Sequence, residues 1–154
     1  MSADENLNDQ QFGYRMQHQP TFGKGIHEID QEMPDYHEHP EYYRYGDPAV
    51  DSEAEHAARK ARRGPDTEVK IYRSAPKGVN KVNPGDWVTT SKTYAKQHGM
   101  GAADDGGNWP VRMTWAKAHE VQFGGNDAVE WGYNGTKSMP TYEVYRGTKG
   151  KRST

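Results

Sequence analysis

A change of pattern at Gly64-Pro65 constrains this 154-residue chain more than any other feature. After that point, short segments rich in Val, Ile, Tyr and Trp alternate with Pro-Gly, Gly-Gly and Gly-Gly-Asn. Short apolar runs separated by turn residues are typical of β-strands joined by tight connections. The predicted strands cover residues 68–73, 86–90, 111–116, 121–123, 128–133 and 142–146. We therefore expect residues 66–146 to form an α+β domain of short, mostly antiparallel strands.

Two helices are predicted beside these strands. The first begins at Ser52 and Glu55, which have capping-box spacing, and it ends at Gly64-Pro65. The second covers residues 92–98, with Ser91 as its N-cap and Gly99 as its terminator.

The first predicted helix ends in a basic cluster, made of Arg59, Lys60, Arg62 and Arg63. Cations at this end complement the helix dipole and give a solvated face. A nucleic-acid patch is the alternative interpretation. The formal net charge of −2 favours the first interpretation and argues against general affinity for nucleic acid or an anionic membrane.

The residues before Pro65 divide into two parts. Residues 1–19 are polar and are predicted to be a disordered or extended tail. Residues 20–65 are predicted to form an irregular arm followed by the first helix. The arm carries Tyr36, Tyr42, Tyr43 and Tyr45, more aromatic side chains than a disordered tail normally has. At the other end, residues 147–154 read as a basic tail.

Composition limits the remaining possibilities. A chain of 154 residues suits one domain, although only 32% of it is hydrophobic and the mean hydropathy is −1.19. The absence of Cys excludes disulfides and a thiol nucleophile. No run reaches the length of a membrane span, and the N-terminus does not read as a signal peptide. We expect a cytoplasmic protein without a membrane partner, although association with a virion or delivery by a specialised secretion route would leave no mark.

Three polar residues lie at or within predicted strands, and each has two interpretations. Arg73 either pairs with a surface carboxylate or captures a phosphate with its guanidinium fork. Ser91 either caps the second helix or positions a carboxylate. Glu130, between Val129 and Trp131, either faces water or stabilises positive charge on a sugar ring. If the strands converge, these side chains provide a cation, a hydroxyl and a carboxylate in one cleft.

The arm also contains His37 and His39, which offer a weak alternative. Their spacing puts both imidazoles on one face of an extended segment, but no third metal ligand is implied. We therefore predict no metal site.

Several short motifs together resemble a known superfamily. In order along the chain they are His39-Pro40-Glu41-Tyr42-Tyr43, Ile71-Tyr72-Arg73, Pro84-Gly85-Asp86-Trp87-Val88, Thr90-Ser91-Lys92, Tyr94-Ala95-Lys96-Gln97-His98 and Glu130-Trp131-Gly132-Tyr133. The chain resembles the ADP-ribosyltransferase superfamily, in its Arg-Ser-Glu branch, and small proteins of actinobacteria and their phages. The close resemblance covers roughly residues 12–135.

This resemblance implies a fold, a substrate and roles for six residues. The fold would be a split β-sandwich that holds NAD between two small sheets. Arg73 would contact an NAD phosphate, while Thr90 and Ser91 would shape the nicotinamide-ribose pocket, with Ser91 orienting Glu130. Glu130 would bind the ribose and stabilise the oxocarbenium-like transition state. Tyr94 or Trp87 would stack on the nicotinamide ring.

The resemblance implies an NAD-dependent ADP-ribosyltransferase, but it does not name the acceptor. Members that modify arginine carry a second Glu two residues before the catalytic one, and here that residue is Ala128. Arginine modification is therefore not expected, and a protein acceptor is favoured over nucleic acid. The alternative is a non-enzymatic interaction protein, or a virion-associated structural protein, that has a degenerate form of this fold and docks through its aromatic arm.

Overall fold

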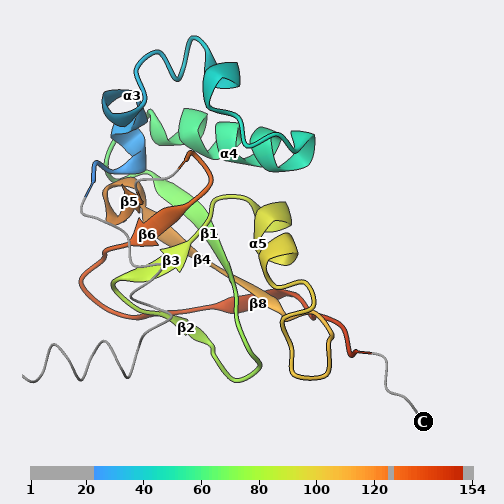
Figure 1. Ribbon diagram of the computed structural model, residues 1–154. Coiled ribbons are helices and arrows are strands. Elements are labelled where there is room, and N and C mark those ends of the chain that lie inside the picture. Colours follow the sequence, from blue (N-terminus) through green and yellow to red (C-terminus); the bar gives the residue numbers. More distant parts are fainter. Residues whose placement is uncertain (1–22, 125–126, 151–154) are drawn as a thin grey trace, which may run out of the picture.

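The computed structural model describes residues 23–124 and 127–150, which form an α+β fold of short strands and helices (Figure 1). The strands are β1 (Glu68–Ser74), β2 (Lys81–Val82), β3 (Asp86–Val88), β4 (Val111–Lys117), β5 (Val121–Phe123), β6 (Trp131–Tyr133), β7 (Met139–Pro140) and β8 (Tyr142–Tyr145). The helices of the described chain are α3 (Ile29–Glu32), α4 (Pro48–Ala61) and α5 (Lys92–His98), and three 3₁₀ turns accompany them: η1 (Ile26–Glu28), η2 (Pro40–Tyr43) and η3 (Ala118–Glu120).

All strand pairs are antiparallel. One three-stranded sheet has the order β1-β4-β8, a second has the order β3-β6-β5, and β2 pairs with β7. The two larger sheets meet where Tyr72 and Thr89 exchange backbone hydrogen bonds of 2.8 and 3.0 Å. The predicted α+β class with antiparallel strands is confirmed. This junction brings the end of β1, which carries Arg73, beside the segment that follows β3. That segment contains the predicted site residues Thr90 and Ser91.

The strand predictions differ from the structure mainly at the ends. The predicted strand 128–133 is shortened to Trp131–Tyr133, because the Asp127 carboxylate accepts hydrogen bonds from the amides of Val129 (3.0 Å) and Glu130 (3.1 Å). These two amides are therefore bonded within a turn and do not pair with a neighbouring strand. The predicted strand 86–90 ends at Val88, because the next residue turns to pair with β1. The two-residue strands β2 and β7 are too short to produce a sequence pattern.

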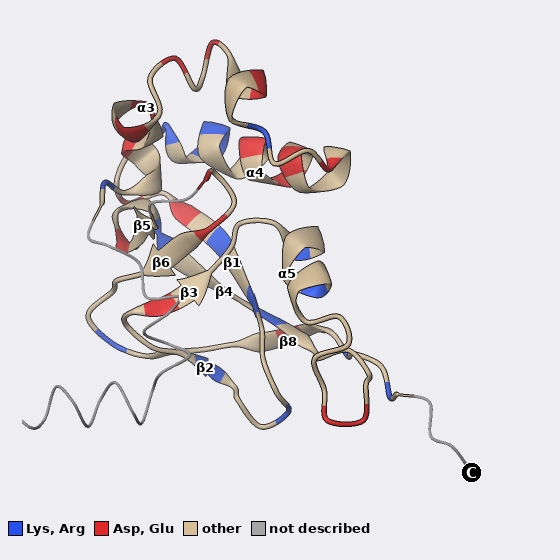
Figure 2. Cartoon of the chain, viewed as in Figure 1, with Lys and Arg blue, Asp and Glu red and all other residues tan. Residues whose placement is uncertain are grey.

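Helix α4 begins earlier than the capping-box spacing predicted. Asp47 is the N-cap, and its carboxylate accepts hydrogen bonds from the amides of Ala49 (3.0 Å) and Val50 (3.3 Å). Pro48 at the first helical position suits this start, since its missing N–H would have no partner there. The Ser52 capping box was therefore wrong, and Ser52 lies inside the helix. Acidic residues gather in the first half of α4 and basic residues in the second half (Figure 2).

The predicted bounds and caps of helix α5 are confirmed. It covers Lys92–His98, the Ser91 hydroxyl accepts a hydrogen bond from the Tyr94 amide (3.0 Å), and Gly99 is the C-cap.

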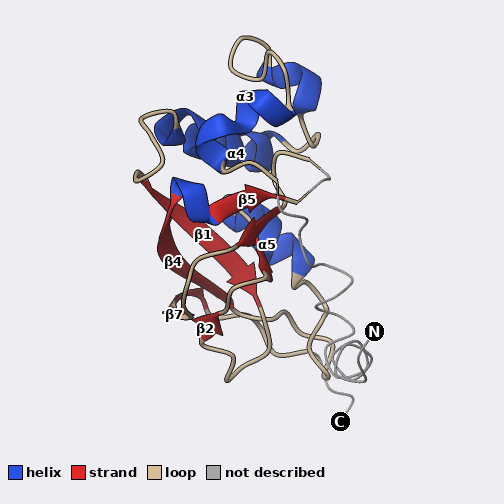
Figure 3. Ribbon diagram, turned by 90° about the vertical axis from the view of Figure 1, so that its left-hand side faces the viewer, coloured by secondary structure: helices blue, strands red, loops and turns tan. Residues whose placement is uncertain are grey.

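The segment before α4 belongs to the core of the fold. Ile26, Ile29, Met33 and Tyr36 are at most 5% exposed. They pack in one cluster with residues from α4, β1, β3, β5 and β6, among them Ala58, Ile71, Val88, Val121 and Trp131. Helices α3 and α4 lie together at one end of the strands (Figure 3). The arm predicted to lie along the domain is thus, from residue 23 onward, partly built into it.

The structure does not describe the two ends of the chain. The predicted tail 1–19 and residues 151–154 of the basic tail lie outside the described ranges. Among the helices that the structure describes, none has the length and apolar character required to cross a lipid bilayer.

Candidate functional site

A cavity of about 470 Å³ lies where β1 ends, β3 begins and α5 ends. We call it the Arg73 cavity. It is lined by Arg73, Ser74, Ala75, Pro76, Val79, Gly85, Asp86, Trp87, His98, Ala102 and Trp109. Its volume is typical of sites that bind small molecules, which range from roughly 300 to 1,000 Å³. Two of the predicted site residues, Arg73 and Trp87, therefore border one cavity.

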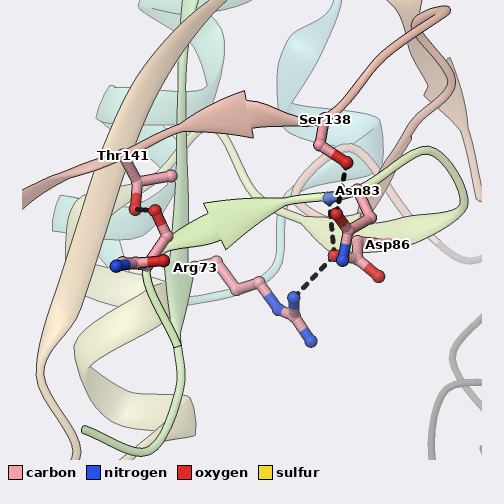
Figure 4. Close-up of polar contacts among 6 residues, drawn as sticks. Arg73, Asn83, Asp86, Ser138 and Thr141 are labelled. Carbon is pink, nitrogen blue, oxygen red and sulfur yellow. Dashed lines mark hydrogen bonds and ion pairs between the residues drawn. The ribbon is translucent and has the colours of Figure 1, made fainter. Parts of the chain in front are cut away.

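Arg73 is held by a buried ion pair. Its Nη1 atom lies 2.7 Å from Oδ2 of Asp86, whose side chain is 1% exposed (Figure 4). The same carboxylate oxygen accepts a hydrogen bond from the Asn83 amide (2.8 Å), and the side chain of Asn83 accepts one from Ser138 (2.5 Å). Arg73 is thus neither solvated nor paired with a surface carboxylate. A guanidinium has five N–H donors, so the pair fixes the fork and leaves donors for a ligand.

Aromatic rings continue from the cavity toward helix α5. The Trp87 and His98 rings, which both line the cavity, have centroids 4.7 Å apart. Tyr94 lies one turn before His98 on α5, and its centroid is 5.9 Å from that of Trp87 and 6.3 Å from that of His98. The i, i+4 spacing of Tyr94 and His98 places both rings on one face of the helix. That spacing was present in the sequence, but His98 was not among the predicted residues.

The Tyr94 hydroxyl donates a 2.7 Å hydrogen bond to Oε2 of Glu130. Burial, reinforced by this bond to the carboxylate, raises the pKa of Tyr94 well above its ordinary value, so the phenol keeps its proton. Glu130 is partly buried, while its neighbours Val129 and Trp131 are each 1% exposed. The partner of the Glu130 carboxylate is therefore Tyr94, a residue whose ring was expected to stack on nicotinamide.

Asp127 adds a second carboxyl near Glu130. Burial is the main cause that raises the pKa of Asp127, and the charge of Glu130 raises it further. Because its Oδ1 atom also caps the turn before β6, Asp127 fixes the backbone from which the Glu130 side chain projects.

Ser91 is bound to a different carboxylate from the predicted one. Its hydroxyl donates to Oε1 of Glu53 (2.7 Å) on helix α4, and the same Glu53 accepts from the amide (3.0 Å) and hydroxyl (2.9 Å) of Thr93. A hydroxyl has one proton to donate, so this bond excludes a simultaneous one to Glu130. In this geometry Ser91 joins α5 to α4 and caps α5, and it does not orient Glu130. Glu53 was not predicted as a site residue, since its position in the acidic first half of the predicted helix gave no signal of a partner 38 residues away.

Thr90 also lies apart from the Arg73 cavity. Its side chain borders a separate groove together with Tyr72, Lys92 and Trp115. It is 4% exposed, and its hydroxyl has no hydrogen-bond partner among the described residues. The structure thus places Arg73 and Trp87 at one cavity. Tyr94 packs near Trp87 and binds Glu130, but neither Tyr94 nor Glu130 is among the described residues that line the cavity. Thr90 borders the separate groove, and the Ser91 side chain binds Glu53 and the Tyr94 amide.

The His-rich segment does not assemble a metal site in the part of the chain that the structure describes. No group of three metal-ligating side chains occurs there. The Nδ1 atom of His39 lies 3.0 Å from Oε2 of Glu41. The His39 ring stacks on that of Tyr42, with 4.7 Å between the ring centroids.

No protein-family model matches this chain, and neither a curated protein nor a solved structure is significantly similar to it. The function is therefore inferred from the geometry of the Arg73 cavity and the residues near it.

Proposed function

We propose that this protein is an NAD-dependent ADP-ribosyltransferase that binds NAD at the Arg73 cavity and uses Glu130 at the reacting ribose. The observation that carries the proposal is the hydrogen bond from Tyr94 to Glu130. It joins a carboxylate to Tyr94, whose ring centroid is 5.9 Å from that of Trp87 in the lining of a cavity that also has a fixed arginine. A phosphate-binding fork, flat aromatic surfaces and a carboxylate are what NAD cleavage requires.

The residues that line the cavity are compatible with part of a dinucleotide. Arg73 would bind a phosphate through the donors that its pair with Asp86 leaves. Trp87 and His98, whose rings pack against each other, would offer a flat apolar surface to a planar ring. Ser74 supports a polar ligand, because it lines the cavity, is 6% exposed and has a hydroxyl without a hydrogen-bond partner among the described residues. A ligand oxygen or amide would satisfy that hydroxyl.

The proposed reaction breaks the bond between nicotinamide and the ribose carbon. The bonding electrons leave with nicotinamide, which becomes neutral, and positive charge develops on the ribose. The Glu130 carboxylate stabilises that charge, and an acceptor then attacks the ribose carbon and loses its proton to solvent. Tyr94 acts as a positioning residue for Glu130, in the role that the resemblance gave to Ser91.

The two three-stranded sheets that meet at Tyr72 and Thr89 are compatible with a split β-sandwich, which we propose as the finer description. Ala128, where arginine-modifying members carry a second Glu, is 5% exposed. We therefore propose an acceptor other than arginine, and we favour a protein.

The test is to incubate the full chain with NAD and a cell lysate as acceptor and to measure free nicotinamide by chromatography. We expect Glu130→Gln to lower release by about 100-fold or more, because the amide keeps the shape but not the charge. NAD affinity, measured by calorimetry, should change by less than about threefold. Glu143→Gln on the exposed strand β8 is the matched control and should match the wild type. A wild type that neither binds NAD nor releases nicotinamide would sink the proposal.

An interaction protein is the second candidate, and an exposed ring pair favours it. Tyr42 is 66% exposed and stacks on His39. On this alternative the wild type releases no nicotinamide, and Tyr42→Ser weakens association with a partner while Glu130→Gln has no effect. Deleting residues 1–50 cannot test this alternative, since Ile26, Ile29 and Tyr36 are core residues.

A further inference from the structure

A second concave site, distinct from the Arg73 cavity, lies between helix α4 and the sheet. It is a groove of about 510 Å³ bordered by α4, β1, Trp115 of β4 and the start of α5. We call it the Trp115 groove. None of the residues that line it also lines the Arg73 cavity. On β1, Tyr72 borders the groove and the next residue, Arg73, borders the cavity.

Four cations border the groove: Arg59 and Lys60 from α4, Lys70 from β1 and Lys92 from α5. None of the four forms an ion pair with any residue in the ranges 23–124 and 127–150. Figure 2 shows basic residues on the second half of α4 and on the strand beneath it. The groove thus concentrates positive charge in a chain whose net charge is −2.

The single carboxylate in the groove offsets only part of the charge of these four cations. Glu53 is the only acidic residue in its lining, and it already accepts hydrogen bonds from Ser91 and from the amide and hydroxyl of Thr93. An anionic ligand would therefore meet four cations whose charge is not offset by a local ion pair.

Trp115 lies among the cations. It is partly buried and is directly opposite Lys70 in the β1–β4 register. The Nζ atoms of Lys60 and Lys70 are 4.9 and 5.3 Å from the centre of its ring. Cation–π contacts hold both ammonium groups over the indole. A base that displaced one of them from the ring and stacked on Trp115 would bring its phosphate to those lysines.

Thr90 provides an independent indication of a ligand. It lines the groove, is 4% exposed, and its hydroxyl has no partner among the described residues. A buried hydroxyl without a hydrogen-bond partner is unusual in a folded protein, and a phosphate oxygen in the groove would accept a hydrogen bond from it.

We propose that the Trp115 groove binds a segment of single-stranded nucleic acid. The cations come from three separate elements, which suits several successive phosphates better than the single phosphate of a mononucleotide. An indole among cations suits an unstacked base, whereas a duplex keeps the faces of its bases inside the stack. The basic end of α4 is thus part of a binding surface, in addition to complementing the helix dipole. This inference does not depend on NAD chemistry at the Arg73 cavity.

The experiment measures fluorescence anisotropy of a fluorescein-labelled dodecathymidylate titrated with the full chain, at salt from 50 to 200 mM. About three phosphate contacts predict a slope near −2 in a plot of log affinity against log salt. Lys60→Gln/Lys70→Gln should reduce that slope by about 1.4 and weaken binding at least tenfold at 50 mM salt. The control is Lys81→Gln/Lys137→Gln, which removes the same charge from β2 and an exposed loop and should leave the slope unchanged.

Two variants test the ring and the hydroxyl. Trp115→Leu should weaken binding about tenfold with little change in the salt slope, because stacking is not ionic. Thr90→Val keeps the shape of the side chain, and it breaks no hydrogen bond within the described residues, since the Thr90 hydroxyl has no partner there. It should weaken binding a few-fold, while circular dichroism should show that the chain stays folded.

Several results would overturn the proposal. They are no binding by the wild type at 50 mM salt, equal losses in the two double-lysine variants, thymidine monophosphate binding as tightly as the oligonucleotide, or a duplex of the same length binding as tightly as the single strand. Loss of NAD cleavage alone would leave this proposal intact, because its readout is oligonucleotide binding.

Discussion

The Ser91 hydroxyl lies 2.7 Å from the Glu53 carboxylate and so ties the start of helix α5 to helix α4. The same hydroxyl accepts a hydrogen bond from the Tyr94 amide as the N-cap of α5. One fully buried side chain therefore fixes the direction of α5 and joins it to its neighbour. Because α5 carries Tyr94 and His98, this contact also determines where the aromatic side of the Arg73 cavity lies.

Ser91→Ala is expected to lower the free energy of unfolding by about 2 kcal/mol. The change removes the helix cap and one donor to a partly buried carboxylate. Urea denaturation followed by circular dichroism measures the effect. Ser52→Ala is the control: Ser52 has the same side chain, is exposed and does not cap α4, so its replacement should change stability by less than about 0.5 kcal/mol. Equal effects from the two substitutions would contradict the capping role of Ser91.

Tyr94→Phe tests whether Tyr94 positions Glu130. The ring stays, and only the hydroxyl that donates to the carboxylate is lost. If NAD is the substrate, kcat for nicotinamide release should fall about tenfold while KM for NAD stays within about twofold, because the change affects charge stabilisation and not binding. Tyr142→Phe, at a tyrosine that is 63% exposed, should match the wild type. A rise in KM with unchanged kcat would assign Tyr94 to ligand binding instead.

Arg73 and Asp86 should behave as a coupled pair. Arg73→Leu leaves a carboxylate that is 1% exposed without its cation and is expected to cost about 3 kcal/mol of stability. Adding Asp86→Asn removes the buried negative charge that Arg73→Leu leaves behind. The double variant should therefore lose at least about 1 kcal/mol less stability than the sum of the losses of the two single variants. Urea denaturation of all four members of the cycle measures the coupling. Additive effects would show that the pair does not stabilise the fold.

His37 should make stability fall in mild acid. Burial is the main cause that lowers its pKa below the ordinary value of 6.5, and the charge of Arg62 adds to it. Between its folded pKa and 6.5 the unfolded chain binds a proton that the folded chain does not. The contribution to stability is therefore present above pH 6.5 and is lost as the pH falls through the folded pKa. Urea midpoints between pH 7.5 and 5 should decline less in His37→Gln than in the wild type, whereas His56→Gln, at an exposed position, should retain the wild-type decline.

Local signals in the sequence located most elements. Helix Lys92–His98 was predicted with its bounds, since a Ser cap, a short run and a Gly terminator are adjacent in the chain. Strand Val121–Phe123 was predicted with its bounds as well. Helix α4 was misplaced at its start because two capping patterns compete there, and the Asp47-Pro48 pair has the better geometry.

The candidate site was only partly predictable, because strand ends converge according to pairing and not according to sequence distance. Of the three residues that the strand pattern expected in one cleft, only Arg73 is among the described residues that line the cavity; Trp87, which also lines it, was expected only from the resemblance. Glu130 was identified as an unusual carboxylate, but its partner Tyr94 lies 36 residues away and could be found only from the packing of α5 on the sheet.

The sequence by itself determined the α+β class, the positions of most strands and helix α5, because turn residues, caps and apolar periodicity act over a few neighbouring residues. Tertiary structure decided which carboxylate each hydroxyl meets: Glu53 for Ser91 and Glu130 for Tyr94. Those choices depend on how α4 and α5 pack, and packing depends on buried apolar contacts between segments far apart in the chain. Side chains 38 residues apart carry no local trace of one another, so the function of each hydroxyl became visible only in the folded protein.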